Sequence, residues 1–136
     1  MNRTSWFSLM LLALFSLGGI AQAQTAAPAP PTPPGINIVK MGDASMLTGD
    51  KGLTLYTFDP DTDGKSACNG GCAANWPPLT AADGAKLVGQ FTIVTRDDGT
   101  KQWAYKSKAL YYYKADKAPK DTTGDGVGGR WHIAKP

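Results

Sequence analysis

The chain has 136 residues, with 14 basic side chains, 11 acidic side chains and a formal net charge of +3. This near balance excludes a strongly basic binder of nucleic acid or of membrane surfaces. Every acidic residue is Asp and none is Glu, while 16 Gly and 10 Pro interrupt the chain. Because Asp is a poor helix former and Gly and Pro are worse, the composition argues against a helix bundle.

Residues 1–23 have the pattern of a removable export signal. Arg3 supplies the positive start, an apolar run extends from Trp6 to Ile20, and Ala21-Gln22-Ala23 fits the small-x-small rule for cleavage. The run of about 15 residues is shorter than the ~20 that a bilayer-spanning helix needs. We therefore expect a periplasmic or secreted protein, with no stable membrane insertion after the signal is removed.

Residues 24–35 form a Pro-rich stretch that we expect to be an extended linker. It holds Pro28, Pro30, Pro31, Pro33 and Pro34 among small residues. Proline lacks the backbone N–H group that helices and sheets require, so such a stretch favours a polyproline-like tether.

The remainder, residues 36–136, contains an internal duplication with a period of 55 residues. Residues 36–81 align with residues 91–136 without a gap, and residues 82–90 connect them. Two copies of one unit that each leave an apolar face uncovered predict a single domain. The identical pairs are Ile38/Ile93, Val39/Val94, Asp43/Asp98, Lys51/Lys106, Leu55/Leu110, Tyr56/Tyr111, Asp61/Asp116, Lys65/Lys120, Gly71/Gly126 and Trp76/Trp131.

Alternating and β-branched residues predict a mainly β, antiparallel domain. In the first copy we expect strands at 36–41 and 53–58, separated by a turn at Gly42-Asp43. In the second copy we expect strands at 91–96, 102–106 and 109–113. Each copy then enters a long Asp/Gly-rich loop and returns at a Trp, with at most a short helix between Cys68 and Trp76.

A short motif stands at the same place in each copy. Tyr56-Thr-Phe58-Asp-Pro-Asp61 and Tyr111-Tyr-Tyr113-Lys-Ala-Asp116 both read Tyr-x-(Phe/Trp/Tyr)-x-x-Asp. Together with the Cys68–Leu79 segment and the ending around Trp131, this motif resembles the bacterial secreted repeats of unknown function, described as predicted lipoproteins. The resemblance covers residues 36–136 and implies an envelope location and a two-copy domain. It implies no settled activity, and no Cys lies near residue 24 for lipid attachment.

Cys68 and Cys72 are the only cysteines of the chain. Their spacing allows a disulfide if the Gly-containing backbone turns, and an oxidising compartment would preserve it. A redox-active pair is the alternative, although three residues separate the cysteines rather than the two of thioredoxin-type motifs. Zinc would need further ligands, and His132 is the only imidazole.

Asp59, Asp61 and Asp63, followed by Gly64, copy the first half of a calcium-binding loop. The acidic residue at the twelfth position is missing, because Gly70 stands there. Clusters of Asp and Gly also form ordinary turns. Weak calcium binding therefore remains a hypothesis, and no other cofactor is expected.

The aromatic residues divide into those that the two copies share and those that they do not. We expect the shared Tyr56, Tyr111, Trp76 and Trp131 to pack between the copies. Trp103, Tyr105 and Tyr112 are better candidates for an exposed surface that binds a protein or a glycan. Strand alternation turns Tyr112 away from Tyr111 and Tyr113.

These observations predict a non-catalytic module of the bacterial envelope. The sequence contains no nucleophile elbow, phosphate-binding glycine loop or zinc-protease motif, so we do not expect an enzyme. The expected role is binding or structural, and the partner is an unidentified envelope protein or glycan. The alternative is a redox or metal-handling accessory protein that uses Cys68 and Cys72.

Overall fold

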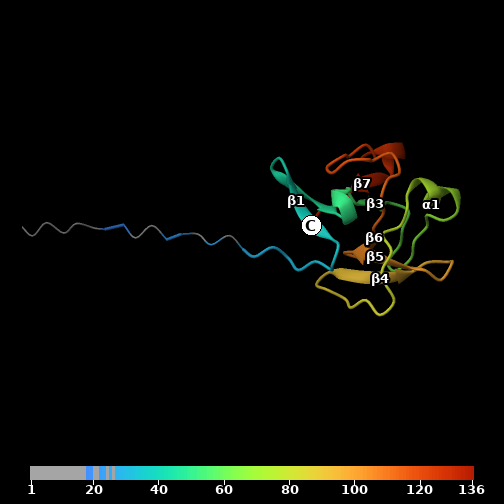
Figure 1. The fold of residues 1–136 in the computed structure, drawn as a ribbon, viewed down its shortest axis with the longest axis horizontal. Coiled ribbons are helices and arrows are strands. Elements are labelled where there is room, and N and C mark those ends of the chain that lie inside the picture. Colours follow the sequence, from blue (N-terminus) through green and yellow to red (C-terminus); the bar gives the residue numbers. More distant parts are fainter. Residues whose placement is uncertain (1–17, 20–21, 24, 26) are drawn as a thin grey trace, which may run out of the picture.

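The computed structural model describes residues 18–19, 22–23, 25 and 27–136. Most of the predicted export signal lies outside these residues. No helix in the described part of the chain is long and apolar enough to cross a membrane. The Pro-rich segment runs away from the folded part as an extended strand of chain (Figure 1).

The end of the predicted linker belongs to the folded domain. The side chain of Pro33 is fully buried, and the backbone N–H of Ile36 donates a hydrogen bond to the Pro33 carbonyl at 3.1 Å. A Cβ atom on Gly89 would stand 3.4 Å from the ring of Pro31. The linker was expected to end at residue 35, but the chain already contacts the folded domain a few residues earlier.

The fold is mainly β and antiparallel, as predicted, and it contains three small sheets. The first sheet pairs β1 (Asn37–Met41) with β2 (Ala44–Thr48), and the second pairs β3 (Tyr56–Phe58) with β7 (Trp131–Ile133). The third contains β4 (Phe91–Thr95), β5 (Lys101–Tyr105) and β6 (Lys108–Ala109). One five-residue helix, α1 (Gly71–Asn75), and two 3₁₀ turns, η1 (Asp50–Gly52) and η2 (Val127–Gly129), complete the described elements.

The duplication is visible in the hydrogen bonds between the two copies. Tyr56 N donates to Tyr111 O at 2.8 Å, and Tyr111 N donates to Tyr56 O at 3.0 Å. The same exchange relates Ala134 N to Leu55 O at 2.8 Å and Leu79 N to Leu110 O at 2.9 Å. In each case the second hydrogen bond is the repeat equivalent of the first, because the donors differ by 55 in number and so do the acceptors. The copies are thus arranged around an approximate twofold axis beside Tyr56 and Tyr111.

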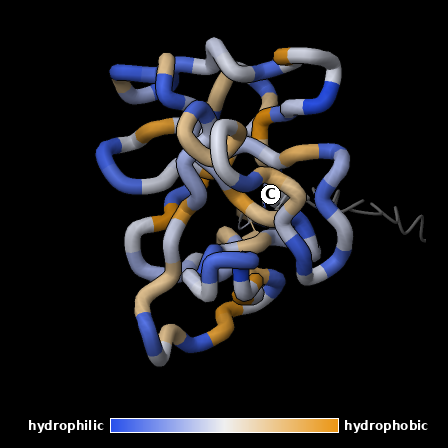
Figure 2. Tube along the Cα trace, turned by 90° about the vertical axis from the view of Figure 1, so that its right-hand side faces the viewer, coloured by the Kyte–Doolittle hydropathy of each residue, from blue (hydrophilic) through white to orange (hydrophobic). Residues whose placement is uncertain are grey.

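Two core clusters hold the fold together, and each takes residues from both copies. One is centred on Leu47, Leu55, Phe91 and Leu110, and the other on Tyr56, Trp76, Tyr111 and Trp131. Hydrophilic residues occupy the outer turns of the chain (Figure 2). Because neither copy encloses a cluster alone, burial of apolar surface joins the two.

Several predicted strands are shorter than expected because the neighbour of the chain changes along them. The strand expected at 53–58 is regular only from Tyr56, since Leu55 N bonds Leu47 O while Tyr56 N bonds Tyr111 O. The strand expected at 109–113 ends at Ala109 and continues only as an isolated bridge at Tyr111. Strands β2 and β7 were not predicted; β7 forms because it pairs with β3 of the other copy.

Candidate functional site

The motif residues form two hydrogen-bonded pairs that cross between the copies. The Tyr56 hydroxyl of the first copy donates to Asp116 Oδ2 of the second at 2.5 Å. The Tyr111 hydroxyl of the second copy donates to Asp61 Oδ2 of the first at 2.7 Å. All four residues are buried, with Asp61 and Asp116 only 4% and 5% exposed. The Tyr and Asp side chains of one motif therefore form hydrogen bonds to the Asp and Tyr of the other motif and not to each other.

The remaining carboxylate oxygens cap the long loops. Asp61 Oδ1 accepts a hydrogen bond from the backbone N–H of Ala67 at 2.7 Å. Asp116 Oδ1 accepts hydrogen bonds from the Thr123 N–H at 3.1 Å and from the Thr123 hydroxyl. A buried carboxylate is stable only when its oxygens have such partners. Each motif Asp thus fastens its own loop and the Tyr of the other copy.

The environment shifts the pKa values of this cluster in one direction. Burial, reinforced by the hydrogen bond to Asp116, raises the pKa of Tyr56 far above its ordinary value. Burial likewise raises the pKa of Tyr111. Burial also raises the pKa of Asp61, although its hydrogen bonds to Ala67 and Tyr111 oppose the shift. Both tyrosines stay protonated and act as hydrogen-bond donors at neutral pH.

Stacked tryptophans close the interface between the copies. The ring centroids of Trp76 and Trp131 lie 3.7 Å apart with an interplanar angle of 2°. Tyr113 stacks on the first ring at 4.1 Å, and Phe58 stacks on the second at 4.2 Å. The four rings form one continuous column. Trp76 and Trp131, which the two copies share, therefore pack between the copies as expected.

Gly124 is required where the second loop passes this column. A Cβ atom at this position would lie 2.8 Å from the Trp76 ring and 2.9 Å from the Tyr56 ring. Its backbone N–H donates to the Tyr56 hydroxyl at 3.3 Å. Only a residue without a side chain allows this close approach.

Arg96 forms a second buried polar network beside the first. It is 6% exposed, and its Nη1 donates to Gln102 Oε1 at 2.7 Å and to Ser66 Oγ at 3.0 Å. Its Nη2 donates to the Cys68 carbonyl at 2.6 Å. The Ser66 hydroxyl also lies 2.6 Å from the Tyr111 hydroxyl, so the network joins the Tyr111–Asp61 pair. The guanidinium of the second copy therefore holds the cysteine loop of the first.

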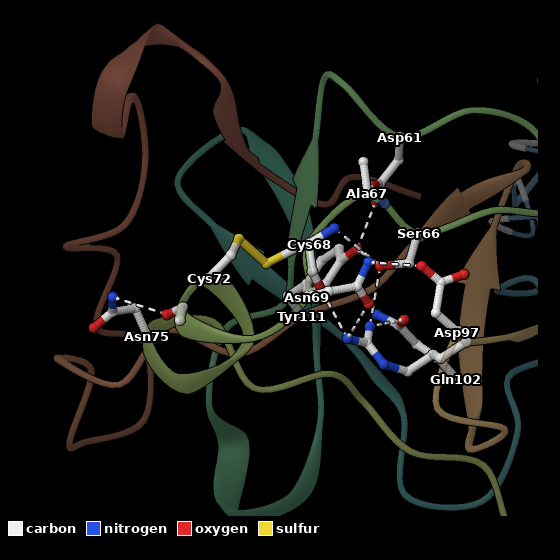
Figure 3. Close-up of a disulfide and its surroundings, with 12 residues drawn as sticks. Asp61, Ser66, Ala67, Cys68, Asn69, Cys72, Asn75, Asp97, Gln102 and Tyr111 are labelled. Atoms are coloured by element: carbon white, nitrogen blue, oxygen red, sulfur yellow. Dashed lines mark hydrogen bonds between the residues drawn. A yellow bond between two sulfur atoms is a disulfide. The ribbon is translucent and has the colours of Figure 1, made fainter.

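Cys68 and Cys72 form a disulfide at the start of α1, with a Cα–Cα distance of 5.2 Å (Figure 3). Cys68 is fully buried in the aromatic cluster, and Cys72 packs against that cluster while partly exposed. The Cys68 N–H donates to Ser66 Oγ at 3.3 Å. The bridge closes the loop that Arg96 and Asp61 anchor on its other side.

The three aspartates of the proposed calcium loop do not converge. Asp61 points inward to Tyr111, whereas Asp59 Oδ2 lies 2.9 Å from His132 Nε2 in an exposed contact. Asp63 lies on the exposed part of the turn. Within the described residues, no group of three His, Cys, Asp or Glu side chains is placed to hold a metal ion. The convergence that the calcium hypothesis requires is absent from these three aspartates, because the carboxylate at the centre, Asp61, bonds to Tyr111 of the other copy.

The aromatic residues expected on a binding surface are mostly buried. Trp103 and Tyr105 are each 6% exposed and belong to the core cluster around Leu47 and Phe91. Tyr112 is partly buried against the same cluster, whereas Tyr111 and Tyr113 pack in the other cluster, so their opposite orientation is confirmed. The expectation of an exposed aromatic surface was wrong, because residues absent from the repeat pattern fill the second half of the core.

The described surface includes two concavities of note. One is a hollow of about 510 Å³ with a mostly apolar lining that includes Pro34, Val88 and Trp103. The other, of about 160 Å³, is lined by Thr57, by Tyr105, Lys106 and Lys108, and by residues 133–135. Trp103 and Tyr105 thus contribute an edge to one concavity each while their rings stay in the core.

Sequence reasoning missed the network of Arg96, Ser66 and Gln102. The one available signal was Gln102, which stands opposite the apolar Leu47 in the ungapped alignment of the copies. A polar residue at a core position indicates a buried hydrogen-bonding group, because burial without a partner is costly. Arg96 gave no such signal, since it ends a predicted strand beside a turn.

Comparison with known protein families agrees with this two-copy architecture. A family model described as "secreted repeat of unknown function" matches residues 37–80 and again residues 92–135. No curated protein and no solved structure matches the chain.

Proposed function

Because the chain belongs to the family of secreted repeats of unknown function, we propose that it is a non-catalytic module that binds a component of the bacterial envelope. One observation supports the non-catalytic part. The titratable residues of the family motif, Tyr56, Asp61, Tyr111 and Asp116, are buried and bonded to each other across the copies. Groups that react with a substrate must reach it, and these groups hold the fold instead.

The location that we propose is the periplasm or the exterior of the cell. The family is secreted, and residues 1–23 have the pattern of an export signal. The disulfide between Cys68 and Cys72 also suits an oxidising compartment. The partner that we propose is a glycan or a protein of the envelope, held by the rigid surface that the inter-copy bonding creates.

Co-sedimentation with purified peptidoglycan sacculi and with envelope membranes tests this proposal. The protein should pellet with one of these fractions and be displaced by an excess of unlabelled protein. A Tyr111→Phe variant should melt at a lower temperature yet still pellet while folded, because the motif supports the fold and not the binding. If the protein pellets with neither fraction, the binding role is wrong.

The Cys68–Cys72 bridge supports a second candidate, a redox or metal-handling accessory function. Titration of free thiols in protein taken directly from cells, with and without reductant, separates the two. A structural bridge has a reduction potential below about −300 mV and stays oxidised. A higher potential, with a mixture of thiol and disulfide in the cell, would favour the redox candidate.

A further inference from the structure

The smaller of these concavities, here called the lysine hollow, lies where the two copies differ. Thr57 of the first copy corresponds to Tyr112 of the second. The Tyr112 ring fills the space over its neighbouring turn, where its hydroxyl accepts a hydrogen bond from Asp50 N–H at 3.0 Å and would overlap any Cβ on Gly49. Thr57 is too short to fill the related space beside Tyr105 and Lys106, and a hollow of about 160 Å³ remains.

Three lysines line this hollow, and no acidic residue does. Lys106, Lys108 and Lys135 all contribute to its lining. In the described part of the chain, none of them is within salt-bridge distance of a carboxylate. Lys106 Nζ lies 5.1 Å from the Tyr105 ring centroid, and Lys108 Nζ lies 3.4 Å from the backbone oxygen of Asp61. Three like charges around one concavity repel each other, and a bound anion would relieve that repulsion.

Asp59, which follows β3, does not line the hollow. His132 stands opposite Thr57 in the pairing of β3 with β7, and its Nε2 contacts Asp59 Oδ2 at 2.9 Å. Asp59 is therefore held on the imidazole rather than on the lysines. The charged side chains that line the hollow are all lysines.

The turn that carries these lysines has a strained backbone. Lys106 has φ of 48° and Ser107 has φ of 68°, a conformation in which hairpin turns normally use Gly or Asn. Such conformations cost free energy for residues with a side chain and concentrate at functional sites. Lys51, the identical residue of the first copy, also has a positive φ, of 59°, so this conformation is shared by the two repeats. At Lys106 it places a lysine at the edge of the hollow.

We propose that the lysine hollow binds a phosphate group, either of a free phosphate compound or of an anionic lipid headgroup. Lysine ammonium groups are compact donors that suit the oxygens of phosphate, and the Thr57 hydroxyl supplies a further donor. This inference rests on the proposed binding role and specifies the chemistry of a ligand. The apolar hollow beside Trp103 carries no such argument, because nothing in the structure indicates what covers it.

The test is a titration of the full chain with inorganic phosphate, followed by the amide NMR signals at constant ionic strength with chloride as reference. Saturable shifts should be confined to the turn at Lys106–Lys108 and to residues 133–135. Replacement of Lys106, Lys108 and Lys135 by Gln should weaken binding by about tenfold or more. Replacement of Lys40, Lys86 and Lys114, three exposed lysines elsewhere, changes the net charge equally and should leave binding within about twofold.

A Thr57→Tyr variant provides a second test that keeps all the charges. It copies the tyrosine of the other repeat, so it should fill the hollow and abolish the phosphate shifts, and thermal melting verifies that the variant is folded. Vesicles of phosphatidylglycerol then separate the sources: hollow-dependent binding to them identifies a lipid headgroup, and binding of phosphate alone identifies a free compound.

Three results would overturn the inference: no saturable shift beyond that of chloride, equal weakening in the two triple-lysine variants, or unchanged binding by a folded Thr57→Tyr variant. The proposed envelope binding fails separately. If the protein sediments with sacculi but does not bind phosphate, only the phosphate proposal is wrong. If it binds phosphate but is not retained by any envelope fraction, only the proposed envelope binding is wrong.

Discussion

Tyr56 and Tyr111 show how one residue type serves two purposes in this fold. Their rings fill the aromatic cluster, while their hydroxyls donate to Asp116 and Asp61 of the opposite copy. A buried ring adds hydrophobic stabilisation, and its hydroxyl requires a partner once water is excluded. The Asp of each motif supplies that partner, which explains why the two residue types occur together at a fixed spacing.

The raised pKa values of the two tyrosines predict an alkaline dependence of stability. In the unfolded chain these groups ionise near their ordinary value of 10.0, whereas in the folded state they ionise only at higher pH. The folded state then binds more protons, so the free energy of unfolding should fall as the pH rises above 10.0. Urea unfolding at increasing pH measures this slope.

Variants identify the groups responsible for the slope. Tyr56→Phe should reduce it, because one of the tyrosines with a raised pKa is gone. Tyr113→Phe serves as the control, since Tyr113 stacks on Trp76 but takes no part in the Tyr–Asp pairs. An identical slope in the wild-type protein and in Tyr56→Phe would contradict the assignment.

Arg96 is the residue whose loss should be most costly among the polar ones. Arg96→Met would leave the Cys68 carbonyl and Gln102 Oε1 without their donor in a buried place. We expect a loss of about 3 kcal/mol in the free energy of unfolding. Arg130→Met, at an exposed position, is the matched control and should change stability by about 0.5 kcal/mol or less. Equal effects of both substitutions would show that the Arg96 network contributes little.

At the scale of the elements, the sequence predicted the two-copy plan but not its turns. The ungapped alignment hides two compensating shifts. The first turn has two residues in the first copy, between Met41 and Ala44, and three in the second copy, between Arg96 and Thr100. The next turn has five residues in the first copy, between Thr48 and Thr54. The related turn of the second copy has four, between Ala104 and Ala109. Sequence identity alone cannot reveal opposite changes that cancel.

Local patterns also could not predict β7 or the burial of Trp103 and Tyr105. The strand at Trp131–Ile133 exists because β3 of the other copy offers hydrogen-bonding partners, which is a tertiary effect. Trp103 and Tyr105 stand between the polar Gln102 and Lys106, yet both flank a fully buried Ala104. What the sequence did predict, the packing of Tyr56, Tyr111, Trp76 and Trp131, came from their repetition.

The close packing of the second loop on the aromatic column predicts that a substitution of Gly124 destabilises the protein. Gly124→Ala would place a methyl group against the Trp76 and Tyr56 rings and should cost about 1–3 kcal/mol of stability. Gly71→Ala is the control, because a Cβ there meets nothing within 4 Å and lies in a helix. Thermal melting of both variants measures the difference; a Gly124→Ala protein as stable as Gly71→Ala would contradict the close packing.

The disulfide has a smaller, predictable contribution. The chain between Cys68 and Cys72 is short, so closing it should stabilise the protein by about 2 kcal/mol. The double replacement Cys68→Ser with Cys72→Ser should therefore lower the urea midpoint yet leave a cooperative transition. Complete unfolding of this variant at room temperature would show that the bridge, rather than the inter-copy core, holds the fold.

At the scale of the whole molecule, two copies that are each incomplete become one domain by exchanging hydrogen bonds and aromatic rings. Both core clusters take residues from both copies. The stacked Trp76 and Trp131 lie where the two copies meet. The symmetry is then broken locally, at Thr57 and Tyr112 and by a disulfide present in only one copy. Those differences are where we expect specific function, because the shared residues are used for closure.

A double-mutant cycle on Tyr56→Phe and Asp116→Asn tests the exchange between copies most directly, with the free energy of unfolding as the measured quantity. The Tyr56–Asp116 contact joins different copies and should give a coupling energy of about 1 kcal/mol or more. The same cycle on Tyr56→Phe and Asp61→Asn, two residues of one motif, should be additive within about 0.5 kcal/mol. Coupling between Tyr56 and Asp61, with none between Tyr56 and Asp116, would contradict the exchange between copies.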